Sequence, residues 1–553
     1  MQCSGAEILV RTLLSHGADT VFGYPGGTVL NIFDELYKNS DKLNFYLTCH
    51  EQGAAHAADG YARATGRTGV VIATSGPGAT NLVTGIATAY LDSTPMVAIT
   101  GNVASGMIGK DSFQEVDIMG ITMPVTKHNY VVKDITKLEH VICEAFQIAN
   151  SGRPGPVLID IPKDIQLATC EFKGGLPLPK KQYRLAQESE LDKAVEIINE
   201  SKRPSIYVGG GVILANAVEE LRAFVNVMDA PIGASMMGLS AIGGMGKMCL
   251  GMTGMHGNYL ASMAMSEADL IIGIGVRFSD RATGNKTEFQ RKAKILHIDI
   301  DDAEIDKNVT AYASILGNIK EVLPRLTAKL TQKDNSKWFE ELTSKCGNTA
   351  YYSNGHKLSP RDIIAAVNKY KSDDTVVATD MGQHQLWTAQ QCAFNKPRTF
   401  ITSGGLGTMG FGMGAAMGAS IGKHHAKTVL VTGDGSFHMN FNEVVSAVSH
   451  NLPLVILVIN NGVLGMVRQW QNLFFDKRFS QTTHNRKTDY VLLAQALGAE
   501  GARVTDRAEL DEVMKKAFEL KDRPIVIDCV IDKDEMVLPM IPPNGSIKNI
   551  ILR

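Results

Sequence analysis

The stretch TVLVTGDGSFHMNFNEVVSAVSHNLPLVILVINN, residues 428–461, contains two apolar runs separated by a helical pattern. The first run, Val429–Thr432, ends at the glycine-rich triplet GDG (433–435), and the second, Leu454–Ile459, ends at two asparagines. Two buried strands joined by one helix form a right-handed βαβ unit with parallel strands. Both strands then end at the same edge of the sheet, where open α/β sheets bind their ligands.

Oxygen ligands follow both of these predicted strands. Asp434 offers a carboxylate and Asn461 an amide oxygen. Mg²⁺ takes oxygen ligands and commonly completes its coordination shell with phosphate oxygens. The glycines beside Asp434 allow backbone N–H groups to approach a phosphate. The stretch therefore predicts a magnesium–diphosphate site, with an ordinary strand–helix–strand unit and tight turns as the alternative.

The composition indicates a multidomain globular protein. The chain has 553 residues, which at roughly 100–200 residues per domain predicts three or four domains. Hydrophobic residues make up 44% and charged residues 20%, as in soluble, well-packed proteins. The net charge of −2 provides no basic field for nucleic acid or a membrane surface.

Cysteine usage and the N-terminal sequence bear on the compartment. The eight cysteines include no CxxC pair, which favours a reducing compartment over a disulfide framework or a zinc site. No apolar run reaches the ~18 residues of a membrane span. The N-terminus leads directly into an amphipathic helix without a signal or transit pattern. We therefore expect a cytoplasmic protein.

Residues 1–165 alternate predicted strands and helices, which indicates a doubly wound parallel sheet whose last strand is 95–100. Glu51 follows the strand predicted at 45–48 and precedes a helix, 52–65, rich in alanine and glycine. A solvated surface carboxylate is one interpretation of Glu51. The small residues after it favour another, in which a backbone or ligand packs closely there.

Two linkers, 166–188 and 330–357, divide the chain into domains of residues 1–165, 189–330 and 358–553. In the middle domain, a strand at 204–208 ends in GGG and another at 295–300 ends in HIDID, so acidic groups stand where nucleotide-binding sheets bind ribose. The GGG is not a GxGxxG motif, and a domain without a ligand is the alternative. The predicted fold class is α/β, with three doubly wound parallel-sheet domains.

A GDG–helix–NN unit is the diphosphate motif of thiamine-diphosphate enzymes, and Glu51 lies in a separate N-terminal sheet domain. Nearly the whole chain resembles the catalytic large subunits of the acetohydroxyacid synthase (acetolactate synthase) family. The stretches that carry the resemblance include YPGG (24–27), HEQGAAHAADGYARATG (50–66), SGRPGPVLIDIPKD (151–164), SGGLGTMGFG (403–412) and GMVRQWQ (465–471).

The resemblance implies a reaction and a role for each domain. The enzyme would decarboxylate pyruvate and join the two-carbon unit to a second 2-oxo acid, giving acetolactate or acetohydroxybutyrate. The three domains would bind the pyrimidine of thiamine diphosphate, FAD, and the diphosphate with Mg²⁺, in that order. Because the net reaction is not a redox reaction, FAD would have a structural or inherited role.

The resemblance also implies catalytic residues. Glu51 would hydrogen-bond the aminopyrimidine of thiamine diphosphate and favour the imino tautomer that removes the thiazolium proton, through a charge-assisted contact. Met409 would hold the cofactor bent, which is catalysis by positioning. The active-site entrance of the family matches Phe113, Gln114 and Lys163, and its acceptor pocket matches Met466 and Trp470.

The implied binding residues fall into three sets. Thiamine diphosphate would contact Tyr24, Pro25, Gly26, Gln383, His384, Gly407, Gly435 and Ser436. Mg²⁺ would be held by Asp434, Asn461 and the main-chain carbonyl of Val463. FAD would contact Arg153, Gly210, Gly211, His256, Gly275, Arg277, Asp280 and Asp299.

The family forms homodimers or homotetramers, because the two halves of its cofactor site meet across a subunit interface. Biosynthetic members also bind a small regulatory subunit, a partner that the catalytic sequence leaves open. We expect 2-oxo acids as substrates and neither nucleic acid nor membrane as a partner.

Several other activities stay open as alternatives. A pyruvate oxidase-type flavoenzyme also carries FAD, but GMVRQW favours the synthase. An FAD-independent catabolic acetolactate synthase is disfavoured by Trp470 and by the flavin-like positions, and a non-catalytic regulatory relative by the presence of Glu51, Asp434 and Asn461. A pyruvate decarboxylase would have adjacent histidines in its pyrimidine domain, and residues 1–165 contain none. A nicotinamide dehydrogenase would leave Glu51 without a function.

Overall fold

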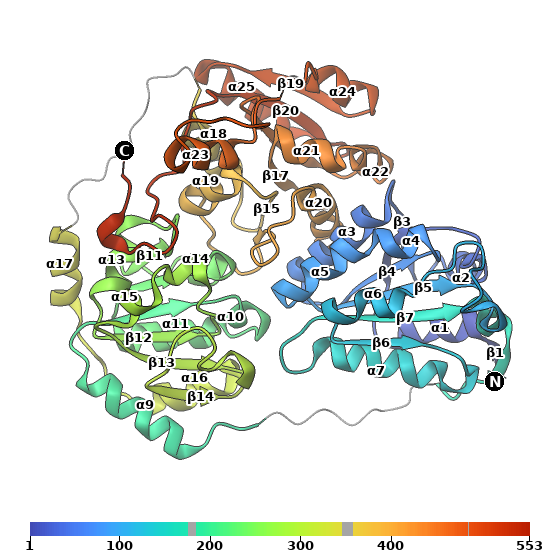
Figure 1. Cartoon of the computed structure of the whole chain (residues 1–553), viewed down its shortest axis with the longest axis horizontal. Coiled ribbons are helices and arrows are strands. Elements are labelled where there is room, and N and C mark those ends of the chain that lie inside the picture. Colours follow the sequence, from blue (N-terminus) through green and yellow to red (C-terminus); the bar gives the residue numbers. More distant parts are fainter. Residues whose placement is uncertain (175–183, 346–357, 485, 553) are drawn as a thin grey trace.

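Three α/β domains and a C-terminal tail make up the computed structural model, which describes residues 1–174, 184–345, 358–484 and 486–552 (Figure 1). Each domain is built on a six-stranded sheet in which every pair of neighbouring strands is parallel. Helices cover both faces of these sheets, because strands buried on both sides need two apolar covers. The predicted fold class is confirmed.

The first sheet has the strand order β3-β2-β4-β5-β7-β6. The strand predicted at 95–100 does not close it, because two further strands follow along the chain. Ser4 caps the first helix, as its side chain accepts a hydrogen bond from the Glu7 N–H. The elements are α1 (Gly5–Ser15), β2 (Thr20–Tyr24), α2 (Leu30–Lys38), β3 (Asn44–Leu47), α3 (Glu51–Thr65), β4 (Gly69–Ala73), α4 (Pro77–Asn81), α5 (Val83–Asp92), β5 (Met96–Asn102), β6 (His128–Val131), α7 (Leu138–Asn150) and β7 (Pro156–Pro162).

The last sheet has the order β16-β15-β17-β18-β20-β19. Counted along each chain segment, the first and last sheets have the same order, 2-1-3-4-6-5, so the two outer domains share one topology. The elements are α18 (Pro360–Tyr370), β15 (Val376–Thr379), α19 (Gln383–Gln391), β16 (Phe400–Ile401), α20 (Phe411–Gly422), β17 (Thr428–Gly433), β18 (Leu454–Asn460), α23 (Gly465–Phe474), α24 (Tyr490–Ala496), β19 (Glu500–Val504), α25 (Arg507–Glu519) and β20 (Ile525–Val530).

The unit 428–461 has the predicted parallel strands but two helices instead of one. β17 and β18 pair from Thr428↔Leu454 to Gly433↔Ile459, so both strands end together. Between them α21 (Asp434–Asn440) stops at Phe441, and α22 (Glu443–Ser449) begins after Asn442. The break leaves the strand ends unchanged, and these are what the ligand site requires.

The middle sheet has the order β11-β10-β9-β12-β13-β14, equivalent to 3-2-1-4-5-6. This is the order of dinucleotide-binding domains, in which ligands bind where the strand order reverses, here between β9 and β12. The elements that the text uses are β9 (Pro204–Val208), β10 (Ile232–Ala234), β11 (Cys249–Met252), α13 (Tyr259–Glu267), β12 (Leu270–Ile274), α14 (Asp280–Thr283), α15 (Lys286–Gln290), β13 (Lys294–Asp299), β14 (Ala313–Leu316) and α16 (Ile319–Ala328).

Both predicted linkers contain regular structure. In the stretch 166–188, β8 (Thr169–Glu171) pairs antiparallel with β1 (Gln2–Ser4), so the first domain extends beyond residue 165. In the stretch 330–357, α17 (Ser336–Lys345) packs its Trp338 and Leu342 against the middle domain. Residues 175–183 and 346–357 of these linkers lie outside the described residues.

The outer domains meet where α3 packs on α20. A Cβ on Gly60 would lie 2.1 Å from the Ala415 carbonyl oxygen, and one on Gly418 only 1.8 Å from that of Ala57. Any side chain at these positions would force the helices apart, so the alanines and glycines of α3 admit a neighbouring helix. The close neighbour predicted from this composition is therefore α20.

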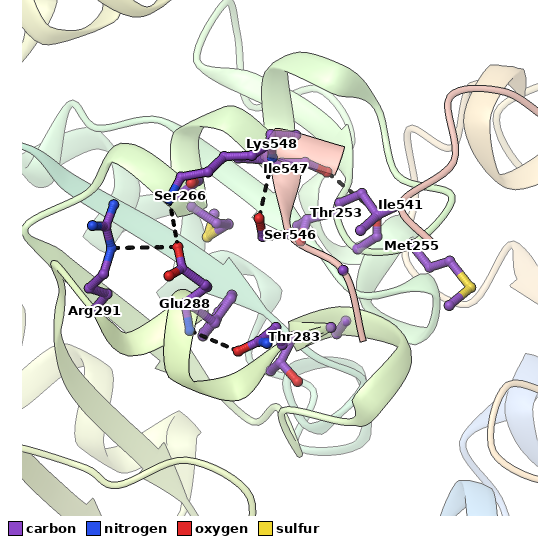
Figure 2. A pocket seen from close by; sticks show the side chains of 18 of the residues that line it. Thr253, Met255, Ser266, Thr283, Glu288, Arg291, Ile541, Ser546, Ile547 and Lys548 are labelled. Carbon is purple, nitrogen blue, oxygen red and sulfur yellow. Dashed lines mark hydrogen bonds and ion pairs between the residues drawn. The ribbon is translucent and has the colours of Figure 1, made fainter. Parts of the chain in front are cut away.

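The C-terminal tail, residues 531–552, crosses from the last domain to the middle domain (Figures 1 and 2). The Ile541 N–H donates to the Met255 carbonyl at 2.7 Å, and the Asn285 N–H donates to the Gly545 carbonyl at 2.9 Å. Lys548 forms an ion pair with Glu288 at 2.9 Å beside a cavity of about 90 Å³. The tail thus joins the two domains.

In the described part of the chain, no helix combines the length and apolar character needed to span a membrane. The seven cysteines within it are free thiols.

Candidate active site

The first half of the predicted site gathers at the carboxyl edge of the first sheet. Gly26, which follows β2, lies against the turn after β4, and a Cβ on it would be 2.5 Å from the Thr74 Cβ. Gly78, in the first turn of α4, lies against Glu51, because its Cβ would be 3.2 Å from Glu51 Oε1. The sequence motifs YPGG, HEQGAA and TSGPGATN thus meet at one place. Tyr24 and Pro25 precede Gly26 there.

Glu51 is held in a buried position at the start of α3. Its side chain is 9% exposed, and Asn81 Nδ2 donates to its Oε2 at 2.9 Å. The backbone before it is also anchored, since the Cys49 and His50 N–H groups donate to the carboxylate of Glu443. The interpretation of Glu51 as a solvated surface group is therefore wrong.

The three predicted entrance residues follow other strands of the same edge. Gln114 packs on Gly76, whose Cβ would lie 2.8 Å from the Gln114 carbonyl oxygen. Lys163 begins the helix that follows β7. Phe113 is 87% exposed, so its ring lies at the surface of the single chain.

The second half of the site lies at the carboxyl edge of the last sheet, which brings together the ends of β15, β16, β17 and β18. Asp434 is 4% exposed. Burial raises its pKa to about 7, although backbone N–H groups that include those of Gly435, Asn461 and Gly462 act in the opposite direction. A buried carboxyl with a destabilised charge is the group that a divalent cation would stabilise, so Asp434 fits a metal ligand.

Asn461 and Val463 complete the predicted ligand set from the neighbouring strand end. Asn461 Oδ1 accepts a hydrogen bond from the Val463 N–H at 3.1 Å, which orients the amide oxygen. The described residues contain no group of three or more His, Cys, Asp or Glu side chains that could hold a metal. One carboxylate, one amide and one carbonyl instead leave coordination positions for phosphate oxygens and water, as Mg²⁺ requires.

His384 and Ser436 border the same strand ends. His384 is buried, burial lowers its pKa to about 3, and its Nε2 has no hydrogen-bond partner among the described residues. A neutral imidazole with a free ring nitrogen fits a polar ligand group. Ser436 Oγ donates to the Met381 carbonyl at 3.1 Å, beside Gly435 in the first turn of α21.

The Gln383 amide is already used within the protein. Its Oε1 accepts from Asn461 Nδ2 at 3.3 Å, and its Nε2 donates to Gln469 Oε1 at 3.0 Å and to the Glu535 carbonyl at 2.8 Å. In this arrangement the side chain of Gln383 braces Asn461 rather than pointing to a ligand. The expected contact with the diphosphate would then come from its backbone at the start of α19.

No sequence pattern predicts the buried contact between Gln469 and the tail residue Val537. Gln469 is 2% exposed, accepts from the Val537 N–H at 2.8 Å and donates to the Val537 carbonyl at 3.0 Å. It therefore connects the tail to Gln383. In the stretch GMVRQWQ, the family resemblance predicts roles for Met466 and Trp470. Nothing in its pattern distinguishes the buried glutamine.

A large cavity of about 1740 Å³ separates the middle domain from the two outer domains. It is lined by all eight residues predicted to contact FAD, namely Arg153, Gly210, Gly211, His256, Gly275, Arg277, Asp280 and Asp299. Its volume exceeds the ~300–1,000 Å³ of ordinary small-molecule pockets, as a dinucleotide requires.

The chemistry of this lining fits a flavin dinucleotide. Burial raises the pKa of Asp299, at the end of β13, to about 6, and lowers that of His256 to about 4. The ring Nδ1 of His256 and the buried hydroxyl of Tyr207 have no hydrogen-bond partner among the described residues. Gly211 and Gly275 also serve the fold, since a Cβ on Gly211 would lie 2.7 Å from the Gly275 Cα.

The predicted acceptor-pocket residues, Met466 and Trp470 on α23, line the same cavity. The Arg281 guanidinium lies 5.6 Å from the Trp470 ring centre, and Phe474 meets that ring edge-on. Gly407 belongs to the lining as well, whereas Met409 lies two residues further along the same loop.

Among the described residues, Glu51 forms no hydrogen bond or ion pair with Asp434, Asn461 or Met409. Asn81 is the hydrogen-bond partner of its carboxylate within the described ranges. The structure thus brings the predicted residues together into two clusters and the large cavity.

Comparison with known proteins identifies the family. Three models of thiamine pyrophosphate (thiamine diphosphate) enzymes match in sequence order: the N-terminal TPP binding domain over residues 3–121, the central domain over 191–326 and the C-terminal TPP binding domain over 380–529. These matches follow the three domains of the structure.

Similarity to individual proteins extends over nearly the whole chain. The acetolactate synthase large subunit of Corynebacterium glutamicum is 45% identical over 561 residues, which cover 98% of this chain and 89% of that protein. The acetolactate synthase isozyme 2 large subunit of Escherichia coli K12 is 43% identical, covering 98% of each chain. The acetolactate synthase large subunit of Haemophilus influenzae is 41% identical and covers 99% of this chain and 98% of that protein. The chain therefore belongs to the thiamine pyrophosphate enzymes and, within them, to the acetolactate synthase large subunits.

Proposed function

We propose that this chain condenses pyruvate with a second 2-oxo acid, pyruvate or 2-oxobutanoate, in branched-chain amino-acid biosynthesis in the cytoplasm. The observation that carries the proposal is the pair of buried clusters, around Glu51 and around Asp434 with Asn461, at equivalent edges of two sheets of the same topology. Thiamine diphosphate, when bound, supplies the electron sink for decarboxylation.

Each cluster would have its own task. Glu51, oriented by Asn81, would hydrogen-bond the pyrimidine ring and control its proton. Asp434, Asn461 and the Val463 carbonyl would hold Mg²⁺, with His384 and Ser436 beside the diphosphate. Met409 would support the bent cofactor, and Phe113, Gln114 and Lys163 would line the entrance for the 2-oxo acid.

FAD would occupy the large cavity, in a role that the reaction does not require chemically. Two observations support this proposal: the Rossmann strand order of the middle sheet, and the buried His256 and Tyr207 groups that lack a partner. Arg153 and Arg277 would face the negatively charged part of the ligand.

A homodimer would be the smallest active unit, and tetramers would be built from it. The lack of a hydrogen bond or ion pair between Glu51 and Asp434 in the described chain supports this proposal, because a second copy can supply the complementary half of each site. Exposed apolar side chains beside both halves, such as Phe113 (87%), Met439 (54%) and Leu406 (41%), provide surface for such contacts. A small regulatory subunit would be a further partner.

The function is tested by incubating the protein with pyruvate, thiamine diphosphate and Mg²⁺, with and without FAD, while acetolactate and oxygen are measured together. We expect acetolactate without oxygen consumption. Oxygen-linked turnover with acetate or acetyl phosphate as the main product would instead identify an oxidase, and acetolactate formation independent of FAD would favour the catabolic type.

Trp470 should control the choice of acceptor. The indole face suits the ethyl group of 2-oxobutanoate, a preference worth ~1–3 kcal/mol. In Trp470→Leu, we expect the ratio of acetohydroxybutyrate to acetolactate formed from mixed substrates to fall by roughly 10-fold. Trp470→Phe keeps a flat aromatic face and should retain most of the preference. An unchanged product ratio in the leucine variant would contradict the assignment.

A further inference from the structure

The loop 402–410, which carries Gly407 and Met409, is held by the first domain of the same chain. Helix α5 contributes Thr88 and Asp92, which are four residues apart and therefore share one face. Thr88 Oγ1 lies 2.7 Å from Thr408 Oγ1. The Asp92 carboxylate accepts from the Gly404 N–H at 3.0 Å and from the Gly405 N–H at 2.7 Å. One helix thus fixes both arms of the loop.

Arg63 of α3 completes this anchor. Its guanidinium pairs with Asp59 and, at 3.0 Å, with Asp92, and it donates to the Thr402 carbonyl at 2.8 Å. Asp92 is 8% exposed and Asp59 is fully buried. A buried carboxylate that accepts hydrogen bonds from an arginine and two backbone N–H groups has a well-defined geometry.

The residues on either side of Asp92 are bound by the two arginines of the large cavity. Arg277 Nη1 donates to the Leu91 carbonyl at 2.5 Å, and Arg153 Nε donates to Ser93 Oγ at 2.8 Å. Both arginines and residues 91–93 line the cavity. Residues 91–93 and residues 403–407 of the loop therefore line the cavity side by side, and residues 91–93 hydrogen-bond both the loop and the two arginines.

We propose that Asp92 is a positioning residue that couples occupancy of the large cavity to the conformation of the loop 402–410. The inference rests on the proposed function for the ligands of the cavity and of the loop. A dinucleotide in the cavity restrains Arg153 and Arg277, these restrain the end of α5, and Asp92 passes the restraint to Gly404 and Gly405. In this way a dinucleotide that takes no part in redox chemistry would still affect the conformation of the loop 402–410. By linkage, thiamine diphosphate tightens dinucleotide binding by the same factor.

Hydrogen exchange on the full-length protein without cofactors tests the anchor itself. Gly404 and Gly405 lie at the surface, yet their N–H groups are bound by Asp92. We expect slow exchange in the segment 402–410 of the wild type and at least ~10-fold faster exchange in Asp92→Asn. The matched control is Asp160→Asn, a carboxylate 1% exposed whose partners, Thr100 and Asn102, lie in its own domain. Equal exchange in Asp92→Asn and wild type, or an equal increase in Asp160→Asn, would overturn the proposal.

Thiamine diphosphate titrations in the presence of Mg²⁺, with FAD removed or added, test the coupling. For the wild type we expect FAD to lower the dissociation constant of thiamine diphosphate by ~5–150-fold, and the ratio to approach one in Asp92→Asn but not in Asp160→Asn. Thr88→Val removes the second anchor without disturbing the ion pairs, and it should reduce the ratio if Asp92→Asn does not fold. FAD binding without any effect on thiamine diphosphate would overturn the coupling alone. An absence of FAD binding would overturn the proposed flavin site as well.

Discussion

Replacing Glu51 with glutamine should lower the rate of acetolactate formation by roughly 10²- to 10⁴-fold, the range that a positioned proton-transfer group contributes. The amide keeps the shape of the side chain and its contact with Asn81, but it cannot supply the charge that favours the reactive tautomer. The dissociation constant of thiamine diphosphate should change little, because in the proposed site Mg²⁺ and the diphosphate are bound by the other cluster. Steady-state acetolactate assays and cofactor titrations measure the two effects separately.

Glu35→Gln is the matched control for this substitution. Glu35 belongs to the same domain and has the same exposed fraction, 9%, but its carboxylate pairs with Lys38 on α2, at 2.6 Å. Its loss should leave the rate nearly unchanged. A Glu51→Gln enzyme that kept more than about a tenth of the wild-type rate would remove Glu51 from the proton transfer.

Asp434→Asn should weaken Mg²⁺-dependent binding of thiamine diphosphate by more than ~100-fold, since even the indirect partners of metal ligands contribute 10–100-fold. The variant removes the carboxylate of the proposed ligand set and leaves that set without a negative charge. Isothermal titration with thiamine diphosphate at a series of Mg²⁺ concentrations measures the effect. Higher Mg²⁺ should restore only part of the affinity.

Asp528→Asn provides the comparison. Asp528 lies on β20, next to β18 in the sheet, and is 1% exposed. Its partners are Asn460 at 2.8 Å and Arg503, also at 2.8 Å, so its role is structural. It should lower stability without changing the Mg²⁺ dependence. The metal assignment fails if both variants weaken cofactor binding equally.

The sequence predicted the fold wherever the local pattern was strong. Apolar runs that end at glycine or asparagine identified β9, β17 and β18, since buried parallel strands leave continuous apolar runs in the sequence. The strand β8 was not predicted because three residues, Thr169–Glu171, carry too little pattern, and their pairing with β1 depends on contacts 160 or more residues away. The break between α21 and α22 was not predicted because the sequence at this point has no glycine or proline.

In the candidate site too, some residues could be predicted from the sequence and others could not. Residues that follow strands could be placed from sequence, because parallel strands bring their carboxyl ends to one edge. Asp434 and Asn461 therefore lie at neighbouring strand ends, as expected. Gln469 and Asp92 could not be found this way, because each acts through partners from distant elements: the tail for Gln469, and the loop 402–410 for Asp92. A lone glutamine or aspartate on a helix has no signature of such contacts.

The docked tail imposes an order on folding. Its contacts with the middle domain join residues as far apart as Lys548 and Glu288, 260 positions along the chain. Domains generally fold as units, the N-terminal ones first during synthesis. The tail can therefore dock only when the last domain has been made and both of its receiving surfaces exist. The tail of a nascent chain would remain undocked until that moment. A protease that cuts within residues 531–552 should therefore cleave newly made molecules faster than mature ones.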